Sequence, residues 1–229
     1  MKKILITQSN YIPWKGFFDS IALVDEVVLY DDMQFTRRDW RNRNKIKTAH
    51  GLLWLTIPVE SKGKYHQKIN ETYASNAEWA VQHWKTIVHN YRKTPHFDTA
   101  SSLLEPLYTN ITTNNLSEIN YWFLSSICRW MGITTPIRFS TEYVLEGDKT
   151  ERLVNLCLQL NATDYYSGPA AKDYLDENVF TRSSINVHYF DYTGYPEYPQ
   201  FHGAFEHGVS IVDLLMHTGN NFRLFMKYL

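Results

Sequence analysis

The sequence predicts an α/β fold in which a mostly parallel, Rossmann-like sheet is flanked by helices. Residues 3–7 form a short apolar run that ends in polar residues 8–10, as a buried parallel strand does when it enters a functional loop. Residues 14–24 then carry apolar side chains at helical spacing, and a second apolar run at residues 26–30 stops at two aspartates. Because crossovers between parallel strands are right-handed, we expect residues 8–10 and 31–34 at the same edge of the sheet.

Strand and helix patterns continue along the chain without an internal repeat or linker, which indicates a single domain over residues 1–229. Further strand signals lie at residues 52–59, 165–168 and 186–192. Helices are expected at residues 78–90, 120–130, 150–160 and 209–216, the third capped by Asp148 and the last ending near Gly219. The first two of these helices form a helical central insertion at about residues 70–135.

Composition limits the classes of partner and the compartment. The net charge is −1, which argues against a protein that attracts DNA or an anionic membrane as a whole. Both cysteines, Cys128 and Cys157, lie in apolar helical patterns typical of buried thiols in a reducing compartment. The basic N-terminus precedes an apolar stretch too short for a signal peptide, and no run reaches the roughly 18 residues of a membrane span. We therefore expect a cytoplasmic protein that does not insert into membranes.

The densest chemical signal is the segment 37–47, where six cations accompany one acid. Arginine side chains bind phosphate oxygens in a bidentate manner, and a tryptophan among them offers a ring for stacking. Two interleaved asparagines add directional hydrogen bonds that solubility alone does not require. The segment thus favours recognition of a phosphorylated ligand with a planar ring, with a solvated basic loop as the alternative. Its candidate binding residues are Arg38, Trp40, Arg41, Asn42 and Arg43.

Asp31 and Asp32, at the predicted end of the second strand, have three interpretations. Paired carboxylates at a sheet edge can hold Mg²⁺ together with substrate phosphates, or one of them can act as a general base. They can equally pair with Arg37 or Arg38 and only orient those cations. The candidate catalytic residues are therefore Asp31 and Asp32, with Gln34 beside them as a binding residue.

The first loop, residues 8–18, lies where open α/β sheets bind ligands, and Gly16 allows close approach of the backbone. The spacing of strand, proline, glycine and helix resembles nucleotidylyltransferases and class I aminoacyl-tRNA synthetases. In those enzymes the loop carries two histidines, whereas this chain has Trp14 and Phe17. The resemblance therefore extends to the fold more readily than to adenylation chemistry.

The remaining candidates lie late in the chain. The nine histidines show no spacing typical of a metal site, so no metal ligands are assigned. His202 and His207, in a glycine-containing stretch, are the histidines best suited to function, although structural roles are the alternative. Ser167, before Gly168, would place a hydroxyl at the same sheet edge, and a plain turn explains this pair equally well.

Several motifs taken together resemble the WbqC-like family of bacterial O-antigen and related surface-polysaccharide (lipopolysaccharide) gene clusters. The resemblance covers nearly the whole chain except residues 64–120, and it rests on Gln8-x-Asn10-Tyr11-x-Pro13-Trp14-x-Gly16-Phe17-Phe18, Asp31-Asp32-x-Gln34-Phe35, Arg38-x-Trp40-Arg41-Asn42-Arg43-Asn44-x-Ile46, Trp54-Leu55-Thr56-x-Pro58-Val59, and Ser167-Gly168 with Asp173-Tyr174-Leu175. Membership implies a role in making or decorating a nucleotide-linked sugar, for instance glycyl transfer to a 4-amino-4,6-dideoxyhexose.

Three functional hypotheses follow. The first is a transferase that joins an acyl or aminoacyl group, from aminoacyl-tRNA or acyl-CoA, to the amine of a nucleotide-linked amino sugar. Arg38, Arg41 and Arg43 would bind the phosphates of the sugar nucleotide or of a tRNA. Asp31, Asp32 or a nearby histidine would take the proton of the amine, and Gln8, Asn10 and Tyr11 would orient the sugar or stabilise the oxyanion. The second is a nucleotidylyltransferase that uses Mg²⁺, and the third is a non-catalytic sugar-nucleotide-binding protein.

Overall fold

The computed structural model describes residues 1–229 and contains a five-stranded parallel sheet, which confirms the α/β fold with a mostly parallel sheet predicted from the sequence. The strand at Ile137–Phe139 has no counterpart in the sequence prediction. The spatial order is β5-β2-β1-β6-β7, built from β1 (Lys3–Thr7), β2 (Glu26–Leu29), β5 (Ile137–Phe139), β6 (Asp164–Ser167) and β7 (Asn186–Tyr189). Counted within this sheet alone, the order is that of the first five strands of a Rossmann-type sheet. The strand order reverses between β1 and β6, so a crevice is expected outside the carboxyl ends of these two strands.

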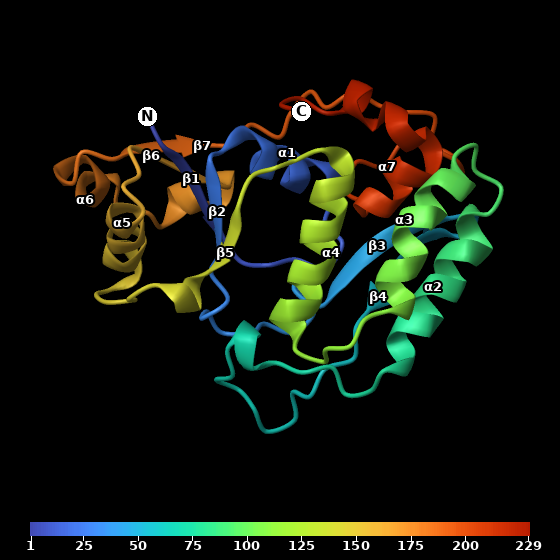
Figure 1. Cartoon of the computed structure of the whole chain (residues 1–229), viewed down its shortest axis with the longest axis horizontal. Coiled ribbons are helices and arrows are strands. Elements are labelled where there is room, and N and C mark those ends of the chain that lie inside the picture. The colour runs from blue at the N-terminus through green and yellow to red at the C-terminus, as the bar shows by residue number, and fades with distance from the viewer.

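Helices cover both faces of the sheet (Figure 1). Helices α1 (Lys15–Leu23) and α4 (Leu116–Met131) lie on one face, and α5 (Lys149–Gln159) and α6 (Glu177–Arg182) lie on the other. Alternate strand residues serve the two sides: Leu5 and Val27 join a cluster of 41 buried residues, whereas Ile4, Ile6 and Val28 join a cluster of 12. Apolar side chains on successive strand residues are therefore required, which explains the continuous apolar runs in the sequence.

The third predicted strand does not belong to this sheet. Strand β4 (Gly51–Thr56) pairs antiparallel with β3 (Arg43–Thr48) in a separate two-stranded sheet. Thr48 faces Gly51 across a two-residue turn, and Gly51 has a φ of +103° that favours glycine. So short a connection permits only an antiparallel neighbour. The second half of the basic segment is consequently a strand of this hairpin and not a loop.

The predicted helical insertion is present between β4 and β5. It contains a 3₁₀ turn η1 (Ile69–Glu71) and helices α2 (Glu78–Tyr91), α3 (Phe97–Thr109) and α4. Helix α3 has no counterpart in the sequence prediction, because Pro106 stands inside it and proline usually ends a helix. These helices pack on each other and on the hairpin (Figure 1).

The C-terminal half agrees with the predicted helix ends. Asp148 caps α5 by accepting hydrogen bonds from the N–H groups of Thr150 and Glu151, and Gly219 follows α7 (Ile211–Thr218). Three further 3₁₀ turns are η2 (Ser140–Glu142), η3 (Pro169–Asp173) and η4 (Gly219–Phe225). Residues 190–210 connect β7 to α7 without a helix or strand. None of the helices combines the length and apolarity that crossing a lipid bilayer demands.

Candidate functional site

The polar ends of β1 and β2 meet at one edge of the sheet, as expected from the right-handed crossover. Strands β1 and β2 are parallel neighbours, with Thr7 opposite Leu29. The backbone N–H of Ser9 donates to Oδ1 of Asp31 at 2.8 Å, and the N–H of Tyr30 donates to the carbonyl of Thr7 at 2.7 Å. Residues 8–10 are thus fixed directly to the start of the loop that follows β2.

A cavity of about 450 Å³ lies at the switch point between β1 and β6, and we call it the switch-point cavity. Gln8 at the end of β1 and Ser167 at the end of β6 line it, as does Arg41. Lys149 and Arg152, from the first turn of α5, add two more cations, and no acidic side chain lines the cavity. Three cations without a carboxylate make it suitable for a phosphorylated ligand.

Arg41 is the most buried of these cations, and one of its N–H donors has no partner within the chain. Its Nη1 donates to Oδ1 of Asn10, its Nη2 lies 3.7 Å from Oδ2 of Asp39, and its buried Nε has no partner. Burial lowers the pKa of Arg41, and Asp39 and Asp31 oppose that shift. A buried guanidinium with a free donor gains most from an anionic ligand, because the ligand supplies the missing hydrogen bonds.

A second cavity, of about 580 Å³, lies beside the amino end of α1, and we call it the aromatic cavity. The ring of Trp14 meets those of Tyr192 and Tyr195 edge-on, at centroid distances of 5.2 and 5.3 Å. Its wall consists of Asn10, Pro13, Trp14, Trp40, Asn44, Tyr192, Thr193, Gly194, Tyr195, His207 and Gly208. Gly16 is needed beneath it, because a Cβ there would lie 2.3 Å from the Trp14 ring.

The two cavities meet at the hydrogen bond between Arg41 and Asn10. Arg41 lines the switch-point cavity, and Asn10 lines the aromatic cavity. The loop that follows β1 therefore contributes to both, through Gln8 on one side and Asn10 on the other. A ligand that binds Arg41 lies next to a side chain of the other cavity.

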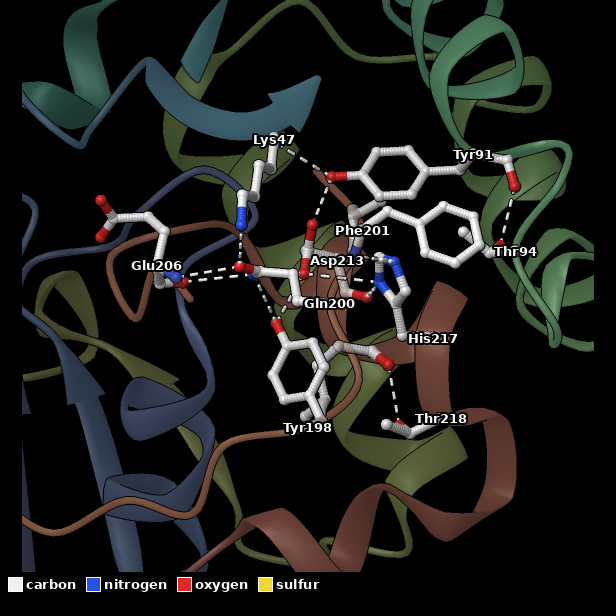
Figure 2. A network of polar contacts seen from close by, with 12 residues as sticks. Lys47, Tyr91, Thr94, Tyr198, Gln200, Phe201, Glu206, Asp213, His217 and Thr218 are labelled. Atoms are coloured by element: carbon white, nitrogen blue, oxygen red, sulfur yellow. Dashed lines mark hydrogen bonds and ion pairs between the residues drawn. The ribbon is translucent and has the colours of Figure 1, made fainter. Parts of the chain in front are cut away.

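A buried polar network fixes the 190–210 segment, which supplies much of the aromatic cavity (Figure 2). Asp213 on α7 accepts hydrogen bonds from the hydroxyls of Tyr91 and Tyr198 and from Nε2 of Gln200, each at 2.7 Å. Although burial acts to raise it, hydrogen bonding to His217, Tyr198 and Tyr91 holds the pKa of Asp213 below its usual value. The charged carboxylate thus ties helices α2 and α7 to this segment.

His217 and Lys47 extend the network at its two ends. Nε2 of His217 accepts a hydrogen bond from the N–H of Phe201 at 3.1 Å, and its Nδ1 lies 2.7 Å from the Asp213 carbonyl oxygen. Lys47 on β3 donates to Oε1 of Gln200 at 2.8 Å and to the carbonyl of Ala204. Lys47, predicted within the phosphate-binding segment, is occupied by these structural contacts.

Besides His207, six of the residues predicted from the sequence line one of the two cavities. Gln8, Arg41 and Ser167 line the switch-point cavity. Asn10, Trp14 and Trp40 line the aromatic cavity. Although separated by up to 159 residue positions, all six come together at the carboxyl edge of the sheet or at the adjoining helix terminus.

Tyr11 and Asn42 are placed in the core instead of at a binding surface. Tyr11 is fully buried, and its hydroxyl shares hydrogen bonds with Nδ1 of His83 at 2.9 Å and the hydroxyl of Tyr108 at 3.0 Å. Nδ2 of Asn42 donates to the carbonyl of Ile57 at 2.8 Å, which attaches the start of β3 to the end of β4. Polar residue type alone did not distinguish these positions from ligand-binding ones.

Four more predicted residues lie outside both cavities. Nε2 of Gln34 donates to the carbonyl of Tyr65 at 2.6 Å, and Arg38 is exposed in a turn with a φ of +59°. The Arg43 guanidinium stacks on the Trp54 ring at 3.9 Å, because β3 directs it to the outer face of the hairpin. His202 is exposed in a separate turn, whereas His207 lines the aromatic cavity.

Asp31 and Asp32 form hydrogen bonds to neighbouring segments at the edge of the sheet. Asp31 is 1% exposed, and its two oxygens accept hydrogen bonds from the N–H of Ser9 and the hydroxyl of Ser117. Asp32 accepts from the Ser140 hydroxyl at 2.6 Å and lies 3.4 Å from Nζ of Lys68, outside both large cavities. With its oxygens occupied, Asp31 does not fit a Mg²⁺ ligand, and neither geometry favours a general base.

Sequence analysis did not assign Lys149, Arg152, Tyr192 and Tyr195 to the site. The available signals were two cations directly after the Asp148 helix cap and closely spaced tyrosines in a segment without periodicity. Neither signal identifies a site by itself, since cations in a first helical turn and tyrosines in loops are common in proteins.

The fold and the two cavities define a Rossmann-like α/β protein whose candidate site lies at the switch point of its sheet. The profile of the WbqC-like protein family matches residues 8–223. The chain belongs to this family. It is also similar to a protein of Mycobacterium tuberculosis (strain ATCC 25618 / H37Rv), described as "Uncharacterized protein Rv1507c", with 50% identity over 228 residues that cover 100% of this chain and 99% of the relative. No solved structure matches the chain.

Proposed function

We propose that the protein is a transferase of surface-polysaccharide biosynthesis that attaches an acyl or aminoacyl group to the amine of a nucleotide-linked amino sugar. The observation that carries this proposal is the switch-point cavity, where Arg41, Lys149 and Arg152 gather without an acid. Such a cluster of cations can bind a diphosphate. The aromatic cavity beside it offers room for a second part of the substrates.

The chemistry proposed is direct attack of the sugar amine on an ester or thioester donor, such as aminoacyl-tRNA or acyl-CoA. The sugar ammonium loses one proton to a base, and its nitrogen forms a bond to the acyl carbon. The acyl C–O or C–S bond breaks, and the second proton passes from nitrogen to the leaving oxygen or sulfur. His207 is the proposed base in preference to Asp31 and Asp32, because it lines the aromatic cavity while the aspartates hydrogen-bond to neighbouring loops.

A covalent acyl-cysteine route is disfavoured by the position of both thiols. Cys128 and Cys157 are 3% and 0% exposed. Burial raises the pKa of each thiol to about 12, so the reactive thiolate is scarce at neutral pH. Neither cysteine lines the two cavities of the site.

Adenylation chemistry is also disfavoured by the residues at the start of α1. Trp14 packs over Gly16 and against two tyrosines, and Phe17 is 8% exposed in the main core. Phe17 has no hydrogen-bond donor, and Trp14 offers only one neutral indole N–H, so the pair cannot replace the paired histidines of nucleotidylyltransferases at a phosphate.

The test is to incubate purified protein with candidate nucleotide-linked amino sugars, with and without charged tRNA or acyl-CoA, and to follow product mass. We expect an adduct with the mass of the acyl group and release of free tRNA or CoA. Pyrophosphate release that depends on Mg²⁺ would support a nucleotidylyltransferase instead. Tight binding without product under any donor would support a non-catalytic binding protein.

A further inference from the structure

The aromatic cavity has a composition unlike that of the switch-point cavity. Its volume of about 580 Å³ falls within the usual range for small-molecule sites. Rings from Trp14, Trp40, Tyr192 and Tyr195 line it, and it contains neither a carboxylate nor a lysine or arginine side chain. Such a wall suits a sugar ring whose C–H faces pack on aromatic surfaces, and it gives no counter-charge to a phosphate.

Asn10 and His207 are polar side chains of this cavity that remain available to a ligand. Oδ1 of Asn10 accepts from Arg41, and none of the hydrogen bonds within the chain uses its Nδ2. His207 is half exposed, and its Nε2 is 4.0 Å from Oε1 of Glu197. In Asn44, by contrast, Nδ2 donates to the carbonyls of Tyr11 and Ile12, and Oδ1 accepts from the N–H of Lys45. Asn10 and His207 can therefore bind hydroxyls or an amine.

We propose that the aromatic cavity is the subsite for the ring of the amino-bearing hexose, with its amine at His207 and its diphosphate at Arg41 in the neighbouring cavity. This inference rests on the proposed function and adds the position of the substrate. The Arg41–Asn10 hydrogen bond joins the two subsites, so one nucleotide-linked sugar spans both. The nucleoside then lies on the switch-point side, where Tyr30, Tyr165 and Tyr174 supply rings.

The segment 190–210 gives this subsite its shape. It contributes Tyr192, Tyr195 and His207 to the wall of the cavity. The same segment is held by the hydrogen bonds of Tyr198 and Gln200 to Asp213 (Figure 2). The ring subsite thus depends on a part of the chain that follows the last strand, whereas the phosphate subsite depends on β1, β6 and α5.

Calorimetry with two ligands separates the subsites. The ligands are a nucleoside diphosphate alone and the same nucleoside diphosphate joined to an amino hexose. For the unaltered protein we expect the sugar to tighten binding by about tenfold, equivalent to about 1.4 kcal/mol. Trp40→Ala and His207→Gln should each remove most of the tighter binding due to the sugar. Their affinity for the nucleoside diphosphate alone should stay within about twofold of that of the unaltered protein. Arg152→Ala should weaken the binding of both ligands by the same factor, so the tighter binding due to the sugar should persist.

Trp122→Ala is the matched control, because Trp122 is 37% exposed on α4 and lines neither cavity. It should change neither affinity. If Trp40→Ala and His207→Gln weaken both ligands equally, the cavity holds the nucleobase and the inference is wrong. If they change neither ligand while the sugar gain persists, the hexose binds elsewhere and the proposed function survives. A protein that binds neither ligand would overturn the proposed function together with this inference.

Discussion

The backbone N–H of Ser9 and Oδ1 of Asp31 are joined by a 2.8 Å hydrogen bond that fixes the loop after β1 to the end of β2. The other carboxylate oxygen of Asp31 accepts from Ser117 at the start of α4. One buried side chain therefore holds two strands and a helix together at the candidate site.

Replacing Asp31 will test this structural role. Asp31→Asn puts an amide where the carboxylate accepts two hydrogen bonds, so one buried donor loses its partner. The free energy of unfolding should fall by about 1–3 kcal/mol, measured by urea denaturation. Glu146→Gln, at an exposed position, is the control and should leave stability unchanged. Unaltered stability in Asp31→Asn would show that the carboxylate is not required for the fold.

The arginines of the basic segment should differ in nucleotide binding. Arg41 lines the switch-point cavity, whereas Arg43 stacks on Trp54 outside it. Arg41→Ala should weaken binding of a nucleoside diphosphate by about 1.5–3 kcal/mol, the range for hydrogen bonds to charged groups. Arg43→Ala should cost less than about 0.5 kcal/mol, as surface changes usually do. Calorimetry that finds equal losses would place the ligand on the hairpin and not in the cavity.

Acid should destabilise the protein through His83. Burial lowers the pKa of His83 to about 4, from an ordinary value near 6.5. Between these values the unfolded chain binds more protons than the folded one, so stability falls as the pH falls through this window. The loss at pH 4.5 relative to pH 7.5 should be about 2–3 kcal/mol from this group.

Urea denaturation of the unaltered protein and of His83→Gln at both pH values isolates this contribution. The amide can still hydrogen-bond to the Tyr11 hydroxyl, but it does not titrate. On acidification from pH 7.5 to pH 4.5, the free energy of unfolding should fall less in His83→Gln than in the unaltered protein, and the difference should match the contribution of His83. Identical acid dependence in both proteins would mean that His83 is not the responsible group.

The Asp213 network should hold the 190–210 segment, which lines the aromatic cavity, in a fixed conformation. Tyr198→Phe removes one of the hydroxyls that Asp213 accepts from, and should lower the free energy of unfolding by about 1–2 kcal/mol. Tyr198 and Gln200 both attach the 190–210 segment to Asp213, so loss of one bond loosens that segment in particular. Amide hydrogen exchange in residues 190–208 should therefore accelerate more than exchange in β1 or β6. Tyr228→Phe, at an exposed tyrosine, serves as the control. Equal acceleration throughout the protein would indicate global destabilisation without a specific effect on this segment.

The sequence by itself determined the parallel character of the sheet, four of its five strands, most of the helices and the edge at which the candidate site lies. Apolar runs over residues 3–7 and 26–30 can be buried on both faces only in a sheet covered by helices, and this burial depends on local sequence. The positions of Asp148 and Gly219 at helix ends likewise follow from capping within a few residues.

Only the tertiary structure decided which polar residues face a cavity. Arg41 and Arg43 belong to the same cationic segment, yet one points into the switch-point cavity and the other lies on the outer face of the hairpin. Tyr11 is buried against α2 and α3, while Lys149, Arg152 and His207 come to the site from more than 100 positions away in the chain. The physical reason is that a cavity is formed by contacts between distant segments, and residue type and local spacing do not encode which segments meet.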